Sequence, residues 1–72
     1  MQYHIRTEGG ERAASTDLVD NFAAEMWAMD WLHASAKERA YVLERADGGF
    51  AMTLFQTDAG QWYRSPRVSS AA

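Results

Sequence analysis

Residues 39–64 read RAYVLERADGGFAMTLFQTDAGQWYR, and this stretch decides the fold. Its central part, residues 50–57, alternates strictly between two kinds of position. Phe50, Met52 and Leu54 point to one side, and the residues between them point to the other. This period of two is typical of a β-strand that buries one face.

Two short glycine-containing turns flank this strand, Asp47-Gly48-Gly49 before it and Asp58-Ala59-Gly60 after it. Turns of this kind join neighbouring antiparallel strands. Residues 39–46 and 61–64 are therefore predicted to be the partner strands of a three-stranded meander. We expect residues 66–72, which begin with a proline that has no amide N–H to donate, to form a frayed tail.

The N-terminal segment gives a second strand signal. Residues 2–8 alternate with Tyr3 and Ile5 on one face, and Gly9-Gly10 supplies a turn. Whether residues 11–14 pair back as a short strand is left open by the sequence, because alanine has little preference for strands.

The segment between these strands is predicted to be a helix over residues 17–34. Ser15-Thr16-Asp17 combines a capping hydroxyl with an acid in the first turn. The spacing within the segment predicts one apolar stripe, which His33 extends and which consists of Leu18, Phe22, Met26 and Met29. We expect this stripe to face the sheet and to form the core with residues such as Ile5, Leu43 and Met52.

Together these elements predict an α+β fold, in which one helix packs on a small antiparallel sheet. The element order is a strand, an optional second strand, the helix and the three-stranded meander, in a single domain spanning residues 1–72. The chain has 72 residues and no cysteine, so no disulfide supports this small core. A domain of about this size buries only about 60% of its chain surface, so close packing or a partner must contribute.

Two tryptophans lie outside the apolar stripe of the predicted helix. Trp27 and Trp31 are four residues apart, on a face rotated by about 150° from the stripe. Large exposed aromatic side chains are frequent at protein interfaces. We therefore predict a partner-binding surface made of these two residues and the nearby Asp20 and Asp30, where the partner is another protein or a second copy in a homodimer.

Two other arrangements of the tryptophans remain open. The C-terminal segment, with Trp62, Tyr63 and Val68, would cover the pair if it folded over the helix. Alternatively, Trp27 and Trp31 would belong to the core, and the stripe of methionines would be exposed.

The sequence offers little for catalysis or metal binding. It has no cysteine nucleophile and no G-x-S-x-G motif, and its glycine pairs lack the pattern of a phosphate-binding loop. His4 and His33 have no partner at metal-ligand spacing. Asp17, Asp20 and Asn21 share one predicted helix and would give too few converging ligands for a cation. We expect a protein that is not an enzyme and that has no metal and no cofactor.

Charge is distributed unevenly along the chain. The net charge is −3, and residues 15–34 carry four acids and no lysine or arginine. Such a balance argues against direct binding of nucleic acid and favours a partner with a basic surface. No apolar run approaches the length of a membrane span, so we expect no membrane contact. The N-terminus has no signal-peptide pattern and cysteine is absent, which favours the cytoplasm.

In length, acidity, absence of cysteine and predicted layout, the chain resembles small inhibitors carried by phages and mobile elements, including anti-CRISPR proteins. These proteins share no motif, so the resemblance assigns no residue. It implies a non-enzymatic inhibitor that binds the basic surface of a nucleic-acid-handling complex. A small homo-oligomeric regulator, similar to an antitoxin, is the alternative. A small metal-binding protein or enzyme that uses His4, His33 or the helix carboxylates is the second alternative.

Overall fold

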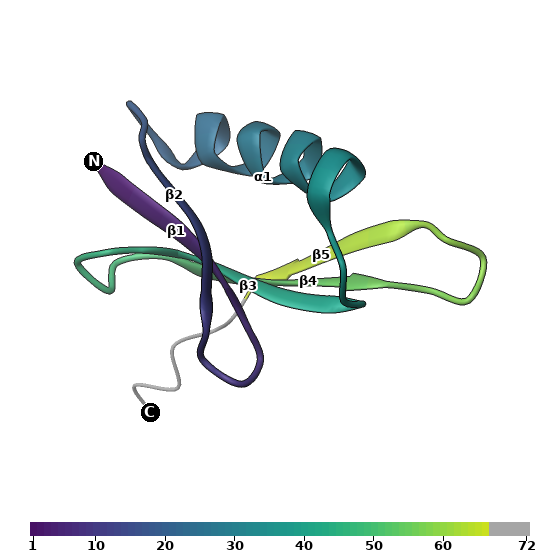
Figure 1. The fold of residues 1–72 in the computed structure, drawn as a ribbon. Helices are drawn as coiled ribbons and strands as arrows, with labels where there is room; N and C mark the ends of the chain where they lie inside the picture. Colours follow the sequence, from purple (N-terminus) through teal and green to yellow (C-terminus); the bar gives the residue numbers. More distant parts are fainter. Residues whose placement is uncertain (67–72) are drawn as a thin grey trace.

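The computed structural model of the protein describes residues 1–66, in which one helix covers one face of a five-stranded antiparallel sheet (Figure 1). The elements follow in the order β1 (Gln2–Thr7), β2 (Arg12–Asp17), α1 (Asn21–Ser35), β3 (Ala40–Arg45), β4 (Ala51–Gln56) and β5 (Trp62–Pro66). The predicted α+β class, with one helix on an antiparallel sheet, is confirmed.

The sheet has the strand order β2-β1-β3-β4-β5, and all neighbouring strands are antiparallel. Two locally connected parts, the β1–β2 hairpin and the β3–β4–β5 meander, meet where β1 pairs with β3. Between them, α1 leads from the edge strand β2 to the central strand β3. Gly48 and Gly60 in the meander turns have φ angles of 81° and 87°, a region that favours glycine.

Strand β2 resolves the question left open for residues 11–14 and corrects the predicted helix start. The strand continues through Ser15, Thr16 and Asp17, which pair with β1. The prediction that these residues cap the helix is therefore wrong. Pairing with β1 gives their backbone groups ladder partners, and Asp20 caps the helix instead by accepting a 2.8 Å hydrogen bond from the Ala23 amide.

The core lies between α1 and the sheet, but the helix face that contributes to it differs from the predicted one. The buried helix residues are Ala24, Ala28 and Leu32, which recur every four residues. The prediction that the stripe faces the sheet is wrong for Phe22, which is 71% exposed, for Met26, which is 49% exposed, and for the exposed His33. Leu18 and Met29, from the same stripe, are half-buried and pack against the core.

Bulky side chains on the sheet explain this choice of helix face. The fully buried large side chains are Tyr3, Ile5, Leu43 and Leu54, and all four come from strands. Space above such a surface is best filled by small helix residues, since interiors are packed without large voids. Alanines at positions 24 and 28 therefore allow a close approach that a phenylalanine or methionine there would prevent.

The C-terminal end of the described chain also differs from the expectation. Pro66 is the last residue of the edge strand β5 and pairs with Met52, so the strand includes one residue that was assigned to the tail. An edge strand tolerates a proline because one side of its ladder has no neighbour. The remaining residues of the predicted tail, 67–72 with Val68, lie outside the described residues.

Candidate functional site

An apolar line of side chains runs along the side of α1 that faces away from the sheet. It consists of Val19, Phe22 and Met26, whose exposed fractions are 78%, 71% and 49%. Phe22 and Met26 are four residues apart and so lie on the same side of the helix, and Val19 lies in the bend that precedes it. We call these three residues, together with the exposed Asp30, the outer surface of α1.

The four residues predicted to bind a partner lie in two different environments. Asp20 and Asp30 are exposed. Trp27 and Trp31 are half-buried and pack against the core. The Trp31 ring meets the buried Tyr41 ring edge to face, with their centroids 5.2 Å apart and an interplanar angle of 85°. These contacts agree with the alternative in which the tryptophans belong to the core, but the methionine stripe is only partly open, because Leu18 and Met29 also pack against the core.

The exposure of Val19, Phe22 and Met26 was not predicted from the sequence. A signal was present, because Ala24, Ala28 and Leu32 repeat every four residues and mark a second apolar line along the helix. The predicted stripe was instead the line with the larger side chains. Side-chain volume alone predicts the wrong packed face of a helix where the opposing sheet already fills the core with large side chains.

The outer surface of α1 lies in an acidic part of the molecule. Of the four acids in residues 15–34, Glu25 pairs with Arg64 of β5 at 3.3 Å. Within residues 1–66, Asp17, Asp20 and Asp30 make no ion pair. Of these three acids, Asp20 caps the helix next to Val19, and Asp30 follows Met26 by four residues on the outer surface of α1.

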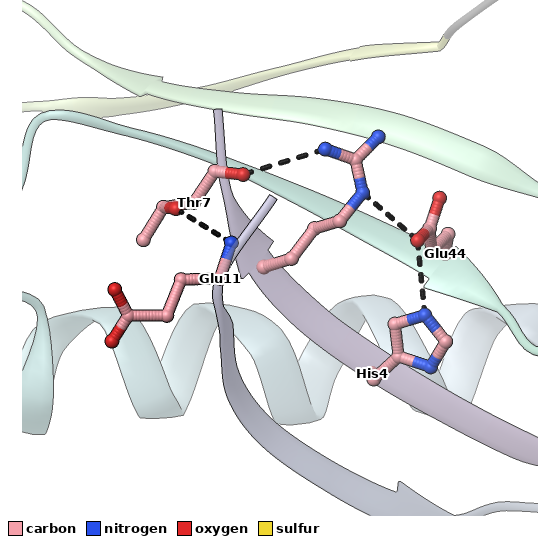
Figure 2. Close-up of polar contacts among 5 residues, drawn as sticks. His4, Thr7, Glu11 and Glu44 are labelled. Carbon is pink, nitrogen blue, oxygen red and sulfur yellow. Dashed lines mark hydrogen bonds and ion pairs between the residues drawn. The ribbon is translucent and has the colours of Figure 1, made fainter. Parts of the chain in front are cut away.

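A second group of polar side chains lies on the opposite face of the sheet, where His4 and Arg6 both contact Glu44. Figure 2 shows His4 beside Glu44. His4 and Arg6 alternate along β1 with the core residues Tyr3 and Ile5, so they point away from α1. The His4 Nε2 and Arg6 Nε atoms both lie 2.9 Å from Glu44 Oε1.

The electrostatics of this group indicate a structural role. Partial burial acts to raise the pKa of Glu44, but hydrogen bonds and charge attraction from Arg6 and His4 outweigh it and hold the pKa below its ordinary value. The carboxylate is thus kept charged, and one of its oxygens already has two partners. The group links β1 to β3 and does not present Glu44 as a free base.

Across residues 1–66, no three side chains of His, Cys, Asp or Glu lie close enough together to share a metal ion. No helix in this part of the chain is long and apolar enough to cross a membrane.

Comparison of the chain with known protein families, with curated proteins and with solved structures found no match. The functional argument therefore depends on the surfaces described above.

Proposed function

We propose that the protein is a non-enzymatic inhibitor that binds another protein through the outer surface of α1. The observation that carries this proposal is the exposure of Phe22, at 71%, on a helix that has a different, fully packed face toward its own sheet. Exposed apolar side chains that line up on one helix face are a common element of helix-in-groove recognition. The fold does not need Phe22 and Met26 in these positions, so a role in binding accounts for them.

The acidic side chains beside the apolar line favour a partner with a basic surface. Asp20 and Asp30 would form an acidic rim beside the apolar line, which fits a groove bordered by lysine and arginine. A twofold dimer through the same surface would bring the acids of both copies together and would be opposed by their repulsion. We therefore favour a basic partner over a second copy.

The resemblance to inhibitors of the anti-CRISPR type supports a more specific version. The partner would be a nucleic-acid-handling complex in the cytoplasm, whose basic surface the protein occupies without itself binding nucleic acid. Trp27 and Trp31 would hold α1 against the sheet and offer the half-exposed edges of their rings at the flank of the contact.

The test compares three forms of the protein for binding to purified CRISPR effector complexes. Wild type and Ala59→Ser, a control in an exposed turn, should bind alike. Phe22→Ser should weaken binding by about 2 kcal/mol or more, as for a hot-spot residue. The association rate of wild type should also fall as salt rises, because steering by exposed charges is screened. Equal binding of all three forms would exclude the outer surface as the contact.

The measured mass in solution decides the alternative of a small homo-oligomeric, antitoxin-like regulator. For the favoured proposal, sedimentation should give a monomer of 8.1 kDa. A concentration-dependent dimer that Phe22→Ser dissociates would instead identify the second copy as the partner.

A further inference from the structure

A small hollow lies where the C-terminal end of α1 meets the β1–β2 hairpin. Its volume is about 230 Å³, and the side chains that matter here are Trp31, Ser35, Tyr41, Glu11, Glu38 and Lys37. Sites for drug-sized ligands are typically about 300–1,000 Å³, so this hollow suits a small group of atoms.

Two aromatic rings form a rigid wall of the hollow. Trp31 and Tyr41 hold each other in the edge-to-face contact at 5.2 Å, and Tyr41 is only 3% exposed. The Tyr41 hydroxyl accepts hydrogen bonds from the Lys37 and Glu38 amides at 2.9 and 3.0 Å. These bonds fix the segment after α1 against the ring, so the shape of the hollow is built into the fold.

The electrostatic character of the hollow is negative. Glu11 and Glu38 line it, and within residues 1–66 neither carboxylate makes an ion pair. Ser35 is the last residue of α1, so the hollow also adjoins the negative end of the helix dipole. Lys37 is the one base among the lining residues, and it offsets only part of this charge.

The turn between β1 and β2 sets the position of Glu11. Its amide donates to the Thr7 hydroxyl at 3.1 Å, and Figure 2 shows the carboxylate extending away from the Arg6–Glu44 pair. Glu11 is therefore not drawn into the ion cluster on the other face of the sheet.

We propose that this hollow binds a small organic cation, a guanidinium group above all. A planar cation gains from contact with an aromatic ring and from carboxylates that accept its N–H groups, and guanidinium can make both kinds of contact. Trp31, Glu11 and Glu38 all line the hollow. The same chemistry is offered by a free small cation or by the arginine side chain of a bound protein.

The test follows the indole N–H signals of the protein by NMR during titration with methylguanidinium. Methylurea, which has nearly the same shape without the charge, is the matched control. Titration should extend to about 50 mM, because so small a group gains little more than millimolar affinity. Methylguanidinium should change the chemical shift of the Trp31 indole N–H in a saturable way. The chemical shift of the Trp27 indole N–H should stay unchanged, because Trp27 does not line the hollow. Methylurea should shift neither.

Removing an acid or a base from the exposed residues of the hollow should change the affinity for methylguanidinium in opposite directions. Glu11→Gln and Glu38→Gln should each weaken binding about two- to fivefold, the range of exposed ion pairs, and Lys37→Gln should strengthen it by a similar factor. Absence of a Trp31 shift, an equal shift with methylurea, or weaker binding by Lys37→Gln would each overturn the proposal.

Two further arms separate the sources of the cation and separate this site from the outer surface of α1. Nα-acetyl-arginine methylamide should bind at least as tightly as methylguanidinium if a protein side chain is the guest, and more weakly if the hollow takes a free cation. Phe22→Ser should leave methylguanidinium binding unchanged, since Phe22 does not line the hollow. A loss of partner binding in that variant thus tests the proposed function alone.

Discussion

The hydroxyl of Tyr3 donates a 2.5 Å hydrogen bond to Asn21 Oδ1, which joins the first strand to the first residue of α1. Tyr3 is fully buried, so its hydroxyl has this partner in place of water. Arg45 Nη1, from the end of β3, lies 3.4 Å from the same amide oxygen. Asn21 therefore fixes where the helix begins relative to two strands of the sheet.

Replacing Tyr3 with phenylalanine should lower the free energy of unfolding by about 1–2 kcal/mol, because the partly buried Asn21 Oδ1 loses a donor from a fully buried side chain. Urea denaturation measures the change. The matched control is Tyr63→Phe, which removes a hydroxyl bonded to Gln61 at an exposed site. The free energy of unfolding of that variant should stay within about 0.5 kcal/mol of wild type. Equal losses in both variants would show that the buried Tyr3 hydroxyl contributes no more to stability than an exposed one.

Truncating a side chain should cost much less stability on the outer face of α1 than on the face that packs against the sheet. Phe22→Ala removes a mostly exposed ring and should change stability by less than about 0.5 kcal/mol. Leu32→Ala, at a residue only 3% exposed, should cost about 2–5 kcal/mol. Thermal melts of both variants measure these losses. A loss of stability from Phe22→Ala as large as that from Leu32→Ala would show that Phe22 belongs to the core.

Trp31→Ala should destabilise the protein by about 2 kcal/mol, below the 3–5 kcal/mol of a fully buried tryptophan because the ring is half-exposed. The loss comes from its contact with Tyr41 and the core around it. Chemical denaturation of Trp31→Ala beside Phe22→Ala is the measurement. A loss no greater than that of Phe22→Ala would contradict the packing role of Trp31.

The link between β1 and β3 through Glu44 should give a pH-dependent contribution to stability. Its folded-state pKa lies below the ordinary value of 4.5, so its contribution is complete above that value and is lost as pH falls through the folded pKa. Glu44→Gln should therefore cost about 1 kcal/mol at pH 7 and progressively less below about pH 4.5. Urea titrations of both proteins at several pH values test this, and a difference that does not change with pH would exclude the charge as its source.

The strands could be predicted where their signals are local. Alternation in β4 and the turns around Gly48 and Gly60 require no knowledge of distant residues, and they placed the meander within about one or two residues of its observed bounds. Asp20 and Asp30, which the sequence placed on the predicted partner-binding surface, are both exposed.

The face of α1 and the length of β2 depend on distant parts of the chain. Ser15 and Thr16 suit a helix cap, but pairing with β1 competes for the same backbone groups and prevails. Ala24 and Ala28 face the sheet only because Tyr3 and Leu43 already occupy the space. The buried line of α1 is rotated by about a third of a turn from the predicted stripe, and this rotation leaves Phe22 and Met26 exposed while Trp27 and Trp31 pack against the core.

The position of β1 between β2 and β3 has a consequence for the order of folding. The β1–β2 hairpin and the meander can each form from near neighbours, but their union brings together residues such as His4 and Glu44, which are 40 positions apart. Closing so long a loop costs entropy before the contact is gained, so this joining should be the late step. Kinetic measurements should then give φ-values near zero for truncation of Ile5 and clearly higher values for truncation of Leu54, within the meander.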